Sequence, residues 1–291
     1  MKDVLKDLVS VGRFTPVTAS QRFAYACASL LVVSGGFHAV VYLVDGGPWA
    51  GPVSWRKPIV FGLSFGVTVA TTAWFMTFLR PGRLFSWVVL GTFAIASVAE
   101  VFLISMQKWR GVASHFNVDT PFDGAVFSMM GALVTVVAVL TVVVTVRSFF
   151  RVDAPPSLAW AIRYGLVLML VSQAVGAQMI AEGGNTFGAA GALKLPHAVT
   201  LHAAQVLPAL AVVLQLSDAT ERQRLRVVAL GAAGYVGLVV ATMVETYSGR
   251  APLDPGAASS ALALVGLGLL AASGLTALRG LPWTRIRPAR V

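Results

Sequence analysis

The sequence predicts an all-α membrane protein, a polytopic transmembrane helical bundle of about eight spans with both termini in the cytoplasm. Three observations predict this fold class. Apolar residues make up 57% of the chain and charged residues only 12%, whereas an ordinary soluble domain carries about 25% charged residues. Eight apolar runs are long enough to cross a bilayer, and basic residues gather in alternate connections between them.

Each apolar run approaches the ~20 residues that a helix needs to cross a hydrocarbon core of roughly 30 Å. The polar stretches between the runs are too short to build a soluble domain, so we expect a cytoplasmic interfacial segment at 1–22, one transmembrane domain at 23–278 and a basic cytoplasmic tail at 279–291. A short interfacial helix is expected within the first of these segments. The runs lie at 23–44, 58–79, 84–106, 125–147, 159–181, 196–216, 226–247 and 259–278.

Basic residues predict the orientation of the chain. The two termini and the even-numbered connections hold 16 of the 22 Lys and Arg residues, and the odd-numbered connections hold six. The positive-inside rule therefore places both termini in the cytoplasm. The same rule explains the net charge of +10, so no nucleic acid is expected as a partner. The expected partner is the lipid bilayer of a cell membrane, and the predominance of Arg over Lys is typical of a bacterial genome rich in G and C.

With this orientation, the residues capable of chemistry lie towards the outer side. The inner connections are short and basic, whereas the outer ones are longer and polar. We therefore expect any functional site to open outward. All four histidines share this placement: His38, His115, His197 and His202.

Glu100 is the clearest single candidate for a functional residue. It lies inside the third apolar run, where an ionisable group costs ~2.5–3.5 kcal/mol and so indicates a functional site. Gln107 follows seven residues later, nearly two helical turns, and should share its face. Glu182 and Glu245 lie near the ends of spans. For these two carboxylates we favour pairing with basic residues at the membrane interface.

The third connection holds five polar residues within fourteen positions, which are enough for an anion clamp, a metal ligand and a general base. They are Arg110, His115, Asn117, Asp119 and Asp123. The acid at position 123 follows Thr and Pro at 120–121, a pattern typical of a helix start. We therefore expect Asp123 to cap the fourth span. His115 and Asn117 have no such structural explanation and are better functional candidates.

His197 and His202 lie five residues apart, about 140° around a helix, so they cannot chelate one metal from a single face. His202 instead shares a face with Gln205. Pro196 suits the first position of a helix, which places His197 in the opening turn. There the helix dipole favours the neutral ring, which can bind a metal or accept a proton. The alternative for each histidine is a hydrogen bond between helices.

Three segments together resemble an uncharacterised family of bacterial multi-pass membrane proteins. They are WRKPIVFGLSFG (55–66), Glu100 with QKWRGVASHFNVDTPFD (107–123), and LPHAVTLHAAQ (195–205). The resemblance covers roughly residues 54–208 and implies no activity, cofactor or substrate. The chain has no HExxH, GxSxG, CxxCH or phosphate-binding glycine loop, so the enzyme classes that those motifs indicate are not favoured.

Three functions fit these observations, and a membrane enzyme with an outward-facing site is the leading hypothesis. Its cofactor would be a metal ion or haem, and its substrate a lipid-like or quinone-like molecule. In this hypothesis, the catalytic residues are Glu100, Asn117 and Arg110, the metal ligands are His115, His197 and His202, and the haem ligands are His38 and His202.

A proton-coupled transporter is the second hypothesis, with Glu100, Glu182 and Glu245 relaying protons. Against it, the inner half of the bundle carries few ionisable groups, and the sequence shows no convincing internal repeat of the kind many carriers have. The third hypothesis is a sensor or scaffold whose outer loops bind a ligand without chemistry.

Overall fold

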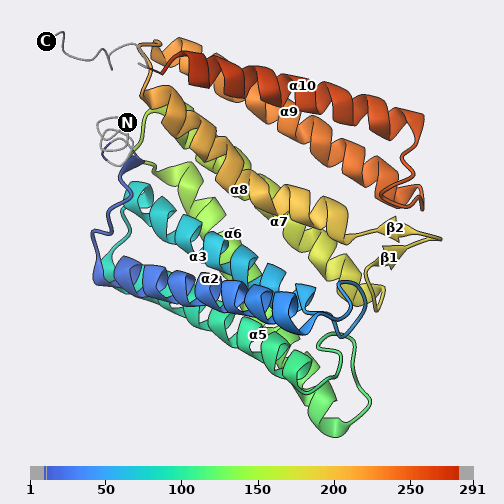
Figure 1. The fold of residues 1–291 in the computed structure, drawn as a ribbon. Helices are drawn as coiled ribbons and strands as arrows, with labels where there is room; N and C mark the ends of the chain where they lie inside the picture. The colour runs from blue at the N-terminus through green and yellow to red at the C-terminus, as the bar shows by residue number, and fades with distance from the viewer. Residues whose placement is uncertain (1–9, 11, 282–291) are drawn as a thin grey trace, which may run out of the picture. The chain divides into compact units, whose positions relative to one another are not determined.

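A computed structural model describes residues 10 and 12–281. The expected interfacial helix and most of the basic tail lie outside the described residues. Within these residues, eight helical segments are long and apolar enough to cross a membrane, as the expected helical bundle requires (Figure 1). They are α2 (Ala19–Asp45), α3 (Arg56–Leu79), a composite span (Arg83–Trp109), α6 (Pro121–Phe150), α7 (Pro156–Ala181), α8 (Lys194–Gln215), α9 (Glu221–Tyr247) and α10 (Ala257–Arg279).

The composite span contains three consecutive helical segments. It begins as α4 (Arg83–Ser86), continues through a π-helical turn η1 (Trp87–Gly91) and ends as α5 (Thr92–Trp109). A π-helical turn inserts an extra residue into the helix and is frequent at functional sites. The side chains of α5 are therefore rotated relative to those of α4.

The chain divides into two compact units. The first unit, Pro16–Val144, holds α2, α3, the composite span and most of α6; the second, Thr145–Val291 with Met1–Thr15, holds α7 to α10. The region expected as one transmembrane domain thus contains two units of four spans. In each unit the long connections join the first helix to the second and the third to the fourth. We call that end of a unit the long-loop end and the other the short-loop end.

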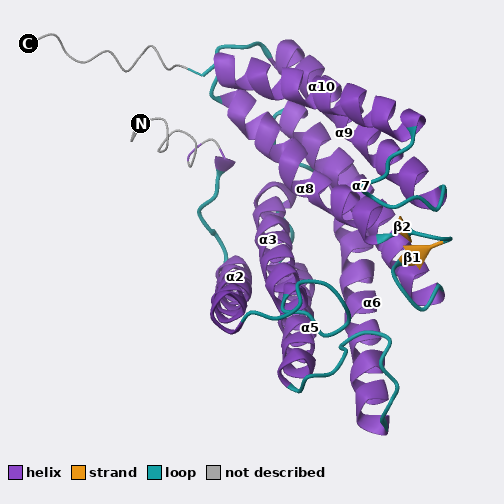
Figure 2. Cartoon of the chain, turned by 45° about the vertical axis from the view of Figure 1, so that its right-hand side comes forward, coloured by secondary structure: helices purple, strands orange, loops and turns teal. Residues whose placement is uncertain are grey.

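Small residues bring helix backbones together in the first unit. A Cβ atom added to Gly62 of α3 would lie 2.9 Å from the Cα and N atoms of Gly35 on α2. Such an approach leaves no room for a side chain, and it lets α2 and α3 pack along their length, as both views show (Figures 1 and 2). Close contact between small residues drives helix association in membranes, where the hydrophobic effect between helices is weak.

In the second unit, glycines likewise allow the backbones of two helix pairs to approach closely. A Cβ atom on Gly165 of α7 would lie 2.7 Å from the Cα of Ala204 on α8, and one on Gly234 of α9 would lie 2.7 Å from the carbonyl oxygen of Gly266 on α10. A short antiparallel hairpin of β1 (Thr186–Phe187) and β2 (Gly191–Ala192) joins α7 to α8 (Figure 2).

The two units repeat one plan. In both, an acidic residue and two glycines end the first helix, the second helix begins two residues before a proline, and a Pro-apolar-Asp triplet accompanies the start of the fourth helix. The triplets in the two units are 121–123 and 252–254, the acid-Gly-Gly sequences are 45–47 and 182–184, and the prolines are Pro58 and Pro196. This correspondence lies in turns and helix starts rather than in extended sequence identity, the kind of repeat that the sequence does not show.

The start of α8 also differs from the expectation. Pro196 was expected at the first helical position, but α8 begins at Lys194. The ring of Pro196 is still tolerated there, because the first turn of a helix leaves its N–H groups without intrahelical partners.

Polar side chains fasten the short-loop end of the first unit. Gln21 of α2 is 2% exposed, and its amide donates to the carbonyl oxygen of Ala73 at 3.0 Å and to Oγ1 of Thr77 at 2.8 Å, both on α3. The hydroxyls of Ser20 and Ser86 lie 2.6 Å apart and join α2 to the composite span. Three helices are thus tied together at this end.

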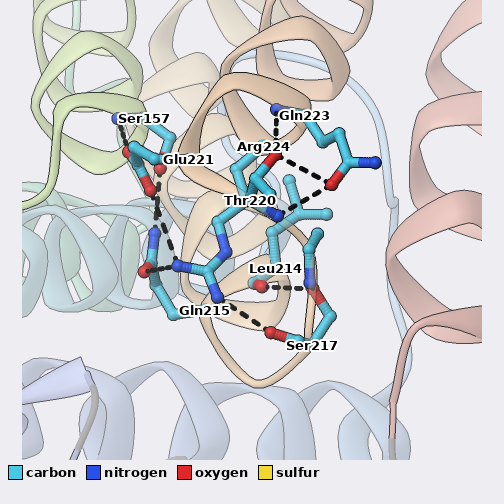
Figure 3. A network of polar contacts seen from close by, with 9 residues as sticks. Ser157, Leu214, Gln215, Ser217, Thr220, Glu221, Gln223 and Arg224 are labelled. Atoms are coloured by element: carbon cyan, nitrogen blue, oxygen red, sulfur yellow. Dashed lines mark hydrogen bonds and ion pairs between the residues drawn. The ribbon is translucent and has the colours of Figure 1, made fainter.

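A second network fastens the short-loop end of the second unit, again between its first three helices (Figure 3). Glu221 of α9 accepts a hydrogen bond from the backbone N–H of Ser157 at 2.6 Å. Arg224 donates to Gln215 of α8 at 2.8 Å and to the carbonyl oxygen of Ser217 at 2.8 Å. Charge-assisted bonds of this kind are stronger than neutral ones, so the second unit is tied at its short-loop end more strongly than the first, whose bonds there are neutral.

Candidate functional site

Glu100 is the most unusual polar residue of the first unit. It is 1% exposed, and neither carboxyl oxygen has a hydrogen-bond partner within the described part of the chain. It lies nine residues before the end of α5, about 14 Å along the helix axis, and so near the middle of the span. An isolated carboxylate is very costly in such surroundings. The group therefore requires either a proton or a positively charged ligand.

Other unsatisfied hydroxyls lie in the same part of the first unit. Thr68 Oγ1 on α3 and Ser105 Oγ on α5 are buried without hydrogen-bond partners among the described residues. Phe61 of α3 packs against the cluster that contains Ile104 of α5. Because α3 and α5 run in opposite directions, Thr68, two turns further along α3, lies within about one turn of the level of Glu100. Thr68 and Glu100 are thus two buried polar side chains at a similar depth in the first unit.

A polar network closes the long-loop end of α5, two turns from Glu100. Gln107 and Asp123 are 0% and 2% exposed, and the amide of Gln107 donates to Asp123 Oδ1 at 2.9 Å. Arg110 donates to the same oxygen at 2.6 Å and also to the side-chain oxygen of Gln107. Thr120 Oγ1 accepts from the backbone N–H of Asp123 at 3.1 Å. Thr120 therefore caps the start of α6, whereas the Asp123 carboxylate accepts from Gln107, Arg110 and the Thr120 hydroxyl. Arg110, a predicted catalytic residue, is held in an ion pair with Asp123.

The connection between α5 and α6 folds His115 against the helices of the first unit. Its ring centroid lies 5.4 Å from that of Phe61 and 6.2 Å from that of Phe116, and Ser114 Oγ lies 2.9 Å from Nδ1. Burial and the positive charge of Lys57 lower the pKa of His115 to about 4. The ring is therefore neutral at physiological pH.

Asn117, a predicted catalytic residue, shapes this connection. Its Nδ2 donates to the carbonyl oxygen of Ala113 at 3.0 Å, and its Oδ1 accepts from the backbone N–H of Asp119 at 3.1 Å. Side-chain to backbone bonds of this type close turns. Phe116 adopts φ 58°, a left-handed conformation that is uncommon for an aromatic residue. The backbone of Phe116 is therefore locally strained at the place where His115 and Phe116 pack.

The buried state of His115 predicts a pH dependence of stability. Below its ordinary pKa of 6.5 the unfolded ring gains a proton, whereas the folded ring stays neutral down to about 4, so stability is lost as the pH falls through this range. At about pH 5 the loss from this group amounts to roughly 2 kcal/mol. We expect the melting temperature to fall more between pH 7 and pH 5 in the wild type than in His115→Gln. An equal fall in both proteins would contradict this interpretation.

His38, a predicted cofactor ligand, has both ring nitrogens engaged. Nδ1 lies 2.7 Å from the carbonyl oxygen of Ser34, and Trp109 Nε1 donates to Nε2 at 3.1 Å. Because Nε2 accepts, Nδ1 carries the proton and donates. Trp55, 7% exposed, packs its ring 5.0 Å from that of Trp109. Binding of haem or metal by His38 would require breaking the Trp109 hydrogen bond.

The two remaining histidines belong to the second unit. His197 Nδ1 lies 2.8 Å from the carbonyl oxygen of Ser172, and the side-chain amide of Gln205 lies 3.3 Å from Nδ1 of His202. The expected pairing of His202 with Gln205 on one face is confirmed. Across the described residues, no three His, Cys, Asp or Glu side chains come together in a group that could hold a metal ion.

Glu245 and Glu182 have different surroundings. Glu245 is 4% exposed; its Oε2 accepts from the backbone N–H of Gly256 at 3.1 Å and from the hydroxyl of Ser259. These bonds fix the start of α10, and Arg250 lies 4.0 Å from Oε1. Glu182 follows α7 at the surface. Glu245 thus has a structural role near Arg250, whereas no basic partner of Glu182 is seen among the described residues.

The repeat distinguishes the first unit from the second at one place. In each unit, an arginine beyond the third helix pairs with the aspartate of the triplet: Arg110 with Asp123 at 2.6 Å, and Arg250 with Asp254 at 3.0 Å. Thirteen positions separate the first pair and four the second, and the additional residues carry His115. Sequence reasoning missed this signal, the unequal length of two corresponding connections.

Comparisons of the chain with protein-family models, curated proteins and solved structures give no match.

Proposed function

We propose that the protein is a carrier that moves a small molecule across the cell membrane, coupled to a proton that binds at Glu100, with both termini in the cytoplasm. The observation that carries this proposal is the buried carboxyl group of Glu100, which has no partner among the described residues and lies near the middle of a span. Ionisable residues at such positions commonly belong to ion pathways and proton relays. A group that contributes to stability alone would be expected to have a hydrogen-bond partner.

The repeated plan of the two units supports transport over catalysis. Many secondary transporters consist of two repeats, and repeats with an even number of spans enter the membrane from the same side. The difference between the units also matters, because the long connection with His115 and the carboxyl group of Glu100 both belong to the first unit. A specific carrier requires a binding site whose residues differ between its two similar units.

The surroundings of His115 suggest the chemistry of the cargo. A neutral imidazole, the nearby positive charge of Lys57 and the rings of Phe61 and Phe116 gather at the long-loop end of the first unit. Together they suit a molecule with an apolar body and an anionic or hydrogen-bonding group, such as a lipid-like or quinone-like molecule. The metal- or haem-dependent enzyme has less support, because the ring of His38 is fully hydrogen bonded.

Labelling with dicyclohexylcarbodiimide tests the proton site, because this apolar reagent modifies protonated carboxyl groups in membranes. We expect mass spectrometry of the protein in liposomes to find the label on Glu100, with labelling lost in Glu100→Gln and reduced as the pH rises. Glu182→Gln is the matched control, since it removes an exposed carboxylate and should leave labelling unchanged. Equal labelling of the wild type and Glu100→Gln would overturn the proposal.

A further inference from the structure

The second unit has an open groove at its short-loop end. It has a volume of about 370 Å³ and lies between the first turns of α7 and α9. One wall is aromatic and the other combines arginines with small apolar residues. Its lining includes Trp160 and Tyr164 of α7 and Arg222, Leu225, Arg226 and Ala229 of α9.

The two arginines of the groove have no partner among the residues that the structure describes. Neither Arg222 nor Arg226 forms a hydrogen bond or ion pair with a described residue, whereas Arg224, between them, is held by Gln215 and Ser217. Four residues separate Arg222 from Arg226, so both lie on one face of α9. An arginine guanidinium group suits phosphate particularly well because it presents several donors in a planar fork.

The groove changes from charged to apolar along its length. Arg222 lies in the first turn of α9, at the level of the helix end, whereas Val228 and Ala229 lie about 10 Å further along the axis. On the opposite wall, Trp160 and Tyr164 are 43% and 42% exposed, with ring centroids 5.6 Å apart. Trp and Tyr are enriched at the level of lipid headgroups. The charge gradient therefore matches the change from headgroup to acyl chain in one leaflet.

We infer that this groove binds an anionic glycerophospholipid, with its phosphodiester against Arg222 and Arg226 and an acyl chain along Leu225 and Ala229. The aromatic rings of Trp160 and Tyr164 would enclose the glycerol region from the other side. Basic pockets between transmembrane helices are known to recognise anionic headgroups. This inference is independent of the proton site, because every residue of the groove belongs to the second unit.

Native mass spectrometry of the purified full chain, titrated with phosphatidylglycerol or phosphatidylcholine in the same detergent, tests the inference. We expect preferential binding of phosphatidylglycerol and roughly 30-fold weaker binding in the double variant Arg222→Gln/Arg226→Gln, since each arginine near a membrane surface contributes about a factor of five. Arg279→Gln, which removes an exposed arginine at the same end of the second unit, is the control and should bind as the wild type does.

Three results would overturn the inference. They are equal binding of the two lipids, a loss of phosphatidylglycerol binding in Arg279→Gln equal to that in the double variant, or complete displacement of phosphatidylglycerol by inorganic phosphate at the same concentration as the lipid. The first would mean that the groove does not read headgroup charge. The second would mean that only net charge matters, and the third that free phosphate rather than a lipid is the ligand. A melting curve of each variant in detergent verifies that the double variant is folded.

Discussion

Gly62→Val will strongly destabilise the first unit. A Cβ atom at this position would lie 2.9 Å from the backbone of α2, at Gly35 and at the carbonyl oxygen of Leu31. Backbone atoms cannot move aside as a flexible side chain can, so α2 and α3 must separate. Overpacking of this kind typically costs about 1–3 kcal/mol and occasionally more, and the upper end is expected where the clash is with backbone. We expect a large fall in the melting temperature and in the yield of monodisperse protein by size-exclusion chromatography.

Gly36→Val is the matched control for this prediction. Gly36 is next to Gly35 on the same helix, yet an added Cβ atom there meets nothing within 4 Å. The β-branched residue should therefore be tolerated, and the melting temperature should stay close to that of the wild type. If the variants at positions 62 and 36 melted alike, the close packing of α2 on α3 would be incorrect.

Glu100→Met will raise stability while removing proton binding. Methionine has a similar length and volume but no polar atoms, so the substitution relieves the cost of burying a carboxyl group without a partner. Protein mutational data place that cost at about 1–3 kcal/mol. We expect a higher melting temperature for Glu100→Met in detergent, together with complete loss of labelling by dicyclohexylcarbodiimide.

Whether the melting temperature of Glu100→Met rises or falls distinguishes a functional role of Glu100 from a structural one. A carboxyl group that fastened helices together would lower the melting temperature when replaced, as removal of one partner of a buried polar pair does. Glu182→Met serves as the control for a general effect of losing a negative charge, because that residue lies at the surface. A lower melting temperature of Glu100→Met, with an unchanged melting temperature of Glu182→Met, would contradict the interpretation that Glu100 serves function at a cost in stability.

Much of the fold follows from composition and periodicity, because a bilayer permits few solutions. Long apolar runs must become helices, since backbone groups have no water to bond with inside the membrane. For this reason the eight spans agree with the eight helices to within several residues. The π-helical turn at Trp87–Gly91 has no such signature, because its extra residue depends on how the composite span packs against α2 and α3.

The candidate site was only partly predictable from the sequence. Glu100 could be singled out because the cost of a carboxyl group inside a span is high wherever it points. The role of Arg110 could not be predicted, because its ion pair with Asp123 depends on how the eleven-residue connection at 110–120 folds back. The engagement of His38 by Trp109, 71 residues away, is likewise a property of packing between helices and is invisible to local patterns.

The proposed transport depends on a proton that Glu100 binds and releases. Infrared difference spectroscopy of the protein in lipid films, recorded between low and high pH, measures this directly through the carbonyl stretch of the protonated carboxyl group. We expect a carboxylic acid band that disappears as the pH rises, that is absent from Glu100→Gln and that persists in Glu182→Gln. Identical difference spectra for the wild type and Glu100→Gln would contradict it.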